Sequence, residues 1–153
     1  AVMYPDNVPA PGADAGPVAA LCRAWSGRHA ALTALMRVTP ENAPHLPASG
    51  RVALGEPTGG THPILDVLPK RPGAFPLDGE SALRTCGIYL AGPECVAALR
   101  RALAEHPEGE VTDGMAFRIL LDAGLPLAGV DAGVEVYDAG EPKDWERAAA
   151  ALG

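Results

Sequence analysis

The sequence lacks any run of about 18 apolar residues that could cross a membrane as a helix, although 48% of its 153 residues are hydrophobic. It also lacks a surplus of positive charge, because 12 Lys and Arg stand against 19 Asp and Glu, a formal net charge of −7. Nucleic-acid binders usually carry a basic patch or stripe. No basic segment followed by an apolar one opens the chain, so we expect no signal peptide. We therefore expect neither a membrane nor a nucleic acid as partner.

Cysteine and histidine are scarce and scattered. The three cysteines, Cys22, Cys86 and Cys95, form no C-x-x-C pair, and the four histidines show no H-x-x-x-H spacing. A disulfide framework or a structural zinc site needs closer groupings of such residues. We expect reduced, mostly buried thiols in a cytoplasmic protein.

Short apolar runs of strand length alternate with segments of helical periodicity. The 18 glycines and 16 prolines between them predict many loops and few long helices. The alternation predicts one α/β domain over residues 1–153, with a Rossmann-like mixed sheet flanked by helices. Strands are expected at 1–4, 31–38, 51–54, 64–68, 83–90, 125–130 and 134–137, and helices at 17–28, 93–105, 113–123 and 142–152.

Two aspartates, Asp6 and Asp138, each follow a predicted strand. Ligands of open α/β sheets bind beyond the carboxyl ends of the strands, and Mg²⁺ takes one or two carboxylates together with phosphate oxygens. The two side chains could therefore share Mg²⁺. The alternative is that both are ordinary turn residues, which spacing alone favours.

Three further positions have a functional and a plain interpretation. Lys70 ends the second strand of the predicted hairpin and could bind a phosphate, or it could be a solvated charge. Glu110 precedes a predicted helix N-cap at Thr112 and could face a ligand, or it could belong to a charged loop. Gly87 lies inside a predicted strand, which is typical of a bulge or of close approach by a ligand.

Seven segments taken in chain order resemble the sugar-1-phosphate nucleotidyltransferases, also called nucleotide-sugar pyrophosphorylases. No single segment is specific to this family, but the order of all seven across nearly the whole chain is much more specific. The last segment gives the strongest match. The segments are 4–7 (YPDN), 31–38 (ALTALMRV), 49–52 (SGRV), 69–72 (PKRP), 84–89 (RTCGIY), 108–113 (EGEVTD) and 136–145 (VYDAGEPKDW).

The resemblance implies an enzyme that joins an NTP to a sugar 1-phosphate, releasing pyrophosphate and forming an NDP-sugar. In that reaction a sugar-phosphate oxygen attacks the α-phosphorus while Mg²⁺ neutralises charge, and the protein supplies positioning and electrostatics. It also implies roles for eight residues. Asp6 and Asp138 would hold Mg²⁺ and act in catalysis, and Lys70 would act in catalysis by contacting the sugar phosphate. Substrate binding is implied for Asn7, Gly50, Gly87, Glu110 and Thr112.

The chain departs from the family pattern at several places. The Gly-rich nucleotide loop is absent, so the resemblance covers the C-terminal two-thirds of such an enzyme and implies a longer polypeptide. Pro69 stands where the family has a glutamate that accepts a sugar hydroxyl, and Glu141 replaces a threonine. The alternatives are therefore a non-catalytic protein that binds sugar phosphates or nucleotide sugars on the same fold, and an unrelated interaction module. The resemblance also allows a homo-oligomer, and it leaves the base and the sugar open.

Overall fold

A computed structural model of the chain describes residues 1–4, 7–10, 16–133, 135–139 and 142–152. For residues 138, 142–144, 151 and 152 the description extends to the backbone only. Its elements in chain order are β1 (Val2–Met3), β2 (Asn7–Pro9), α1 (Pro17–Ala24), β3 (Ala31–Val38), the 3₁₀ turn η1 (Ala43–His45), β4 (Val52–Leu54), β5 (His62–Val67), β6 (Ala82–Ala91), α2 (Pro93–Glu105), α3 (Asp113–Asp122), β7 (Leu127–Asp131), β8 (Val136–Asp138) and α4 (Pro142–Leu152).

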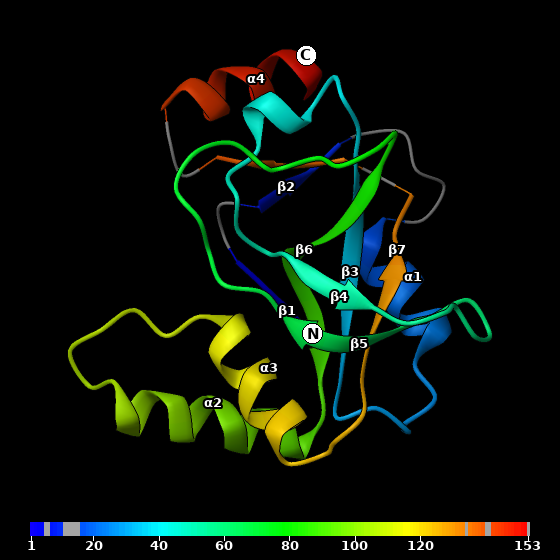
Figure 1. The fold of residues 1–153 in the computed structure, drawn as a ribbon, viewed down its shortest axis with the longest axis vertical. Helices are drawn as coiled ribbons and strands as arrows, with labels where there is room; N and C mark the ends of the chain where they lie inside the picture. The colour runs from blue at the N-terminus through cyan, green and yellow to red at the C-terminus, as the bar shows by residue number, and fades with distance from the viewer. Residues whose placement is uncertain (5–6, 11–15, 134, 140–141, 153) are drawn as a thin grey trace.

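A six-stranded sheet forms the centre of the molecule, with strand order β1-β6-β3-β7-β5-β4. β3 and β7 run parallel, while the other neighbours run antiparallel. β2 and β8 form a separate antiparallel pair. The expected α/β fold with a mixed sheet flanked by helices is confirmed, as is the hairpin formed by β4 and β5 (Figure 1).

The two faces of this sheet bury two apolar clusters. Leu32 and Met36 of β3 pack with Leu21 of α1 in one cluster. Ala31 belongs to the other cluster, with Phe117 of α3 and residues of α2. Successive side chains of a strand point to opposite faces, and all of β3 except Arg37 is buried. The apolar run at 31–38 therefore fills both faces of a covered strand, as its composition predicts.

Some boundaries differ from the expectation. α1 ends at Ala24 rather than at residue 28, because Trp25 is extended and Gly27 adopts a φ of 71°. β1 covers only Val2–Met3 of the expected strand at 1–4, and it is an edge strand in which Met3 is 51% exposed. Cys86 and Cys95 are buried as expected, whereas Cys22 is exposed.

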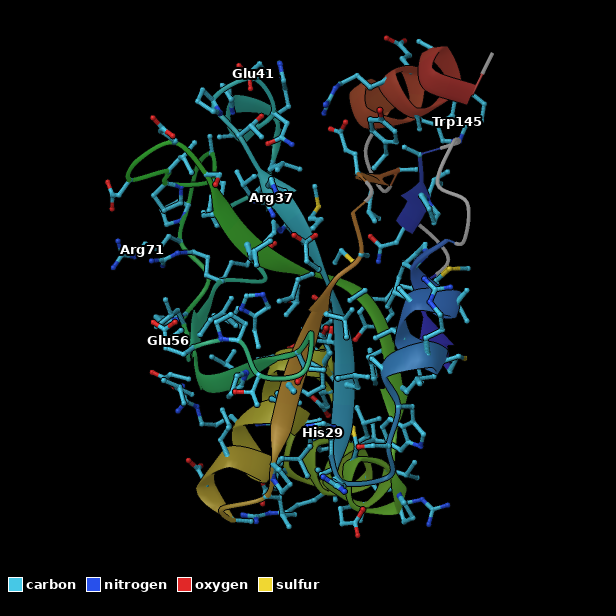
Figure 2. All side chains as sticks on the ribbon, turned by 90° about the vertical axis from the view of Figure 1, so that its right-hand side faces the viewer. His29, Arg37, Glu41, Glu56, Arg71 and Trp145 are labelled. Carbon is cyan, nitrogen blue, oxygen red and sulfur yellow. The ribbon has the colours of Figure 1, made fainter. Side chains whose placement is uncertain are left out.

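One large apolar side chain of the matched segments is exposed on the surface. Trp145, in the last of the seven segments, is 63% exposed on α4 (Figure 2). Among the described helices, none is long and apolar enough to span a membrane.

Candidate active site

A cleft of about 900 Å³ opens where the start of α3 and the end of α2 face the β4–β5 hairpin and the middle of β6. It brings together six of the eight residues that the sequence singled out. These are Asn7, Gly50, Lys70, Gly87, Glu110 and Thr112. They come from five separate parts of the chain, and the sheet topology makes them neighbours.

Gly87 forms a bulge in β6, opposite a register shift in β3 between Thr33 and Leu35. Its φ of 69° lies in the left-handed region that favours glycine. A Cβ at this position would collide with the Asn7 side chain and would lie 2.7 Å from Cδ2 of Tyr4. The missing side chain therefore makes room for Tyr4 and Asn7, which themselves line the cleft.

Gly50 meets β6 equally closely from the hairpin side. Its φ is 64°, and a Cβ would lie 2.5 Å from the carbonyl oxygen of Thr85. The backbone N–H of Thr85 donates a hydrogen bond of 2.8 Å to the Gly50 carbonyl. The two glycines thus allow the backbone and side chains to come close on both sides of the β6 segment 84–87.

Lys70 and Glu110 are exposed at the rim of the cleft, and Thr112 is half-buried. Thr112 occupies the expected N-cap position of α3, but its side chain makes no capping hydrogen bond to the described part of the helix. Asp113 acts locally in its place, because its Oδ1 accepts a bond of 2.8 Å from the N–H of Gly114.

Sequence reasoning missed three cleft residues that lie inside the matched segments: Tyr4, Arg84 and Asp113. The N–H of Asp113 donates a hydrogen bond of 2.9 Å to the Tyr4 hydroxyl, across 109 positions of sequence. Arg84 is only 8% exposed. The sequence offered one signal for Arg84, namely a charged residue inside a predicted strand. Charged residues are rarely buried without a role or partner.

Burial governs the ionisation of this region. It raises the pKa of the Asp113 carboxyl above 3.8, against the opposing effects of backbone hydrogen bonds and Arg84. Burial, followed by the nearby Asp113 charge, also raises the pKa of Tyr4. Burial likewise raises the pKa of Cys86 to about 12 and that of Cys95 to about 11. Both thiols therefore stay protonated near neutral pH, which makes neither of them a nucleophile.

The two candidate metal ligands are only partly described. Asp6 lies outside the described residues, and for Asp138 the backbone alone is placed. Asp138 pairs with Asn7 in the β2–β8 ladder, so it stands beside the residue that follows Asp6 in the sequence and that lines the cleft. Within the described residues there is no group of three or more His, Cys, Asp or Glu side chains able to hold a metal ion.

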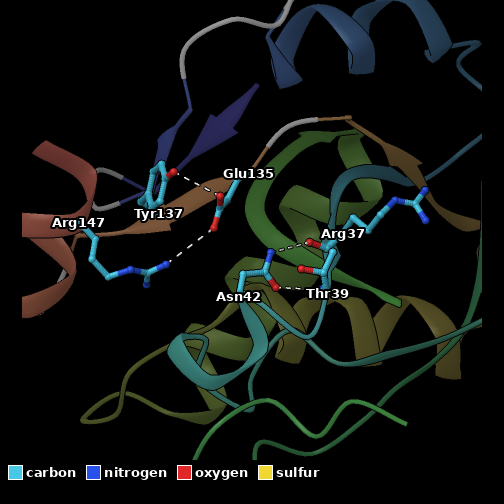
Figure 3. Close-up of polar contacts among 6 residues, drawn as sticks. All are labelled: Arg37, Thr39, Asn42, Glu135, Tyr137 and Arg147. Atoms are coloured by element: carbon cyan, nitrogen blue, oxygen red, sulfur yellow. Dashed lines mark hydrogen bonds and ion pairs between the residues drawn. The ribbon is translucent and has the colours of Figure 1, made fainter. Parts of the chain in front are cut away.

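The strand that carries Asp138 is tied to α4. The Tyr137 hydroxyl donates to a Glu135 oxygen at 3.3 Å, and Arg147 of α4 lies 3.8 Å from the other oxygen of that carboxylate (Figure 3). The Arg147 guanidinium also lies over the Tyr137 ring, 5.8 Å from its centre. These contacts fix β8 against α4. Separately, the Asn42 side chain closes the turn after β3, because its Oδ1 accepts a hydrogen bond of 2.8 Å from the N–H of Thr39 (Figure 3).

The fold is that of the UDP-glucose pyrophosphorylases, which are nucleotidyltransferases. A UTP-bound UGPase from Acinetobacter baumannii matches 99% of this chain with a TM-score of 0.70 and 16% identity. A UDP-glucose pyrophosphorylase complexed with UDP-glucose matches 98% of it with a TM-score of 0.73 and 14% identity. The chain spans about half the length of these structures, 49% and 54%. No protein-family model and no curated protein sequence matches it.

Proposed function

We propose that this chain forms the sugar-phosphate-binding part of a nucleotidyltransferase, one that joins an NTP to a sugar 1-phosphate and releases pyrophosphate. The observation that supports the proposal is the single cleft that collects Asn7, Gly50, Lys70, Gly87 and Glu110 from five parts of the chain. The likeness of the fold to proteins bound to UTP and to UDP-glucose supports it further.

The roles follow from charge and position. Lys70, at the exposed rim, supplies a point charge to the phosphate of the sugar 1-phosphate. Glu110 and the Thr112 hydroxyl, across the cleft from the hairpin, offer hydrogen-bond partners to sugar hydroxyls. The cleft acts mainly by holding the phosphate oxygen in position for attack, because such positioning removes much of the entropic barrier to reaction.

Asp6 and Asp138 would hold Mg²⁺, which when bound neutralises charge on the phosphates. This chain's own contribution is the pairing of Asn7, the residue that follows Asp6 in the sequence, with Asp138. Asn7 also contacts the space above Gly87. The ladder therefore connects the backbone of Asp138 to the floor of the cleft.

Isothermal titration of glucose 1-phosphate, with and without Mg²⁺, tests the proposal on the 153-residue chain. We expect binding, and we expect Lys70→Gln to weaken it by about tenfold, the loss typical of one charge-assisted contact. Arg71→Gln is the matched control, because it removes a neighbouring exposed charge from a side chain outside the cleft lining. Equal weakening in both variants, or no binding by the unaltered chain, would contradict the proposal.

A non-catalytic protein that binds sugar phosphates on the same fold is the second candidate. Pro69 favours it, since a proline stands where the resembling family has a glutamate that accepts a sugar hydroxyl. A pyrophosphate-release assay on the complete natural polypeptide separates the two candidates. Binding without release of pyrophosphate from any of the four common NTPs and glucose 1-phosphate supports the second candidate, and release supports the first.

A further inference from the structure

Tyr4 is held at three points on the floor of the cleft. Its backbone N–H donates a hydrogen bond of 3.2 Å to the carbonyl oxygen of Gly87. Its ring lies so close over Gly87 that a Cβ placed there would be 2.7 Å from Cδ2 of the ring. Its hydroxyl accepts a hydrogen bond of 2.9 Å from the N–H of Asp113, the first residue of α3. The side chain is therefore held between β6 and α3 by contacts of the protein alone.

The hydrogen bonds of the Tyr4 hydroxyl leave it as a donor. A tyrosine hydroxyl offers one proton and two acceptor lone pairs. The N–H of Asp113 occupies one lone pair, and the hydroxyl of Tyr89 occupies the other. Burial is the main cause that raises the pKa of both tyrosines, and the bond between them lowers that of Tyr4 and raises that of Tyr89, as expected when Tyr89 donates. Within the described part of the chain nothing accepts the Tyr4 proton, and Tyr4 lines the cleft.

Tyr89 is itself fixed in the core. It is 1% exposed, and its ring meets that of Phe117 edge to face, with 5.4 Å between the ring centres. A hydroxyl buried to this extent needs a hydrogen-bond partner, and Tyr4 is that partner. The arrangement that turns the Tyr4 proton toward the cleft is therefore built into the packing of β6 and α3.

The Asp113 carboxylate beside this hydroxyl is an acceptor. Asp113 lines the cleft and is half-buried. Its Oδ1 accepts a bond of 2.8 Å from the N–H of Gly114, and a carboxylate has about four lone-pair sites, so capacity to accept remains. After burial, the Asp113 charge is the next cause that raises the pKa of Tyr4, because the two groups are close. The floor thus presents a hydroxyl donor and a carboxylate acceptor side by side.

A donor beside an acceptor matches a hydroxyl group, which both donates and accepts. An ionised phosphate only accepts, and on the floor it would face the negative charges of Glu110 and Asp113. The hairpin side carries Lys70 and Arg51, and Arg51 stands opposite Arg84 of β6 in an isolated antiparallel bridge. The division of charge therefore favours the phosphate on the hairpin side and a sugar hydroxyl on the floor.

We propose that Tyr4 and Asp113 form a donor–acceptor pair that binds one hydroxyl group of the sugar and so helps to select the sugar. Tyr4 donates to the oxygen of that hydroxyl, and Asp113 accepts its proton. This inference rests on the proposed function and adds two residues that the sequence did not single out. A sugar without this hydroxyl would leave both protein groups unpaired, which is a strong basis for discrimination.

The test titrates glucose 1-phosphate and its 2-, 3-, 4- and 6-deoxy analogues calorimetrically into the 153-residue chain and into Tyr4→Phe. Phenylalanine keeps the ring over Gly87 and removes only the hydroxyl. We expect Tyr4→Phe to bind glucose 1-phosphate about fivefold more weakly, the loss typical of one neutral hydrogen bond. One deoxy analogue should bind equally to both proteins, because it lacks the hydroxyl that Tyr4 contacts.

Tyr137→Phe is the matched control. Tyr137 is also half-buried and its hydroxyl is also hydrogen-bonded, to Glu135 at 3.3 Å, but it lies outside the cleft lining (Figure 3). This variant should bind all five compounds as the unaltered chain does. Thermal unfolding followed by circular dichroism checks that each variant is folded at the temperature of the titration.

Asp113→Asn tests the acceptor independently, and it decides the matter if Tyr4→Phe does not fold. Its amide oxygen can keep the bond from Gly114, while its NH₂ group places donors where a carboxylate oxygen accepted. We expect glucose 1-phosphate to bind about tenfold more weakly, because a charge-assisted hydrogen bond is lost. This loss should disappear with the same deoxy analogue that removes the effect of Tyr4→Phe.

The remaining results overturn the inference. Unchanged affinity of both variants for glucose 1-phosphate overturns it, and leaves the proposed function standing if binding still depends on Lys70. Equal weakening for glucose 1-phosphate and all four deoxy analogues shows a structural role instead of contact with the sugar. A loss in only one variant, or losses that disappear with different analogues, overturns the pairing, and the same loss in Tyr137→Phe shows an effect outside the cleft. If the unaltered chain binds none of the five compounds, both proposals fail.

Discussion

The two longest strands of the sheet, β3 and β6, lie side by side and are both buried at their centres, yet they differ in chemistry. β3 is apolar apart from Thr33 and Arg37. β6 carries Arg84, Thr85, Cys86 and Gly87 at the start of its buried stretch, residues 84–89. β3 serves the two apolar clusters, whereas this part of β6 lines the cleft. A buried strand that departs from apolar composition therefore marks the site, and burial alone does not.

Their pairing shows the same difference. Tyr89 pairs with Thr33 and Thr85 with Leu35, so β6 advances four residues where β3 advances two. The extra residues are the bulge at Gly87. Bulges are common next to active sites, where they redirect side chains. β3 keeps the ladder regular, and β6 takes the irregularity that opens room for Tyr4 and Asn7.

The largest effect that separates the two strands is expected from Leu32→Ala. Leu32 of β3 is fully buried against α1, on the opposite side of the sheet from the cleft-lining helices. Its truncation should reduce the free energy of unfolding by about 3 kcal/mol, because it leaves a cavity in a packed core. Urea unfolding measures the loss, and titration should give an unchanged affinity for glucose 1-phosphate. An affinity that falls with the stability would refute the division of roles between the strands.

A smaller effect on stability, with an added effect on binding, is expected from Gly87→Ala in β6. The left-handed φ of 69° costs an alanine about 1 kcal/mol, and the collision with Tyr4 and Asn7 adds about 1 to 2 kcal/mol. The displaced Asn7 should also weaken sugar-phosphate binding. Urea unfolding and titration measure the two losses.

Gly73→Ala is the matched control for this variant. Its φ of 89° carries the same kind of backbone cost, but no described atom lies within 4 Å of a Cβ placed there. The difference between the two variants therefore isolates the contact with Tyr4 and Asn7. Equal losses in both variants would mean that the space above Gly87 is not constrained by these side chains.

The contrast between β3 and β6 also explains what the sequence could predict. The bounds of β3 and of α2 match their predicted ranges, 31–38 and 93–105, because local composition and a proline at the helix start determine them. β2 was expected to be a loop, since it has three residues and its partner β8 lies far along the chain. Short strands that depend on distant partners leave little local signal.

The same reasoning applies to the candidate site. Lys70, Glu110 and the glycines could be singled out because they lie at strand ends, inside a strand or in segments that resemble a family. The opposition of Arg51 and Arg84 could not, because it depends on the register between two strands that are not consecutive in the chain. The bond between Asp113 and Tyr4 depends on the position of the edge strand β1 beside β6.

The smallest expected effect is a pH dependence that belongs to the cleft and not to β3. Because burial raises the pKa of Asp113, the folded chain binds more protons at this group than the unfolded chain does from pH 3.8 upward. The contribution of Asp113 to stability therefore falls as the pH rises through this range, and it is most unfavourable above the raised pKa.

Asp113→Asn cannot ionise, but its amide oxygen can still accept the N–H bond from Gly114. Urea unfolding at a series of pH values should thus show the Asn variant gaining stability relative to the unaltered chain as the pH rises toward neutral. Leu32→Ala removes no titratable group, so its loss should stay constant over the same range. A constant difference for Asp113→Asn as well would show that the Asp113 carboxyl ionises as freely in the cleft as in the unfolded chain.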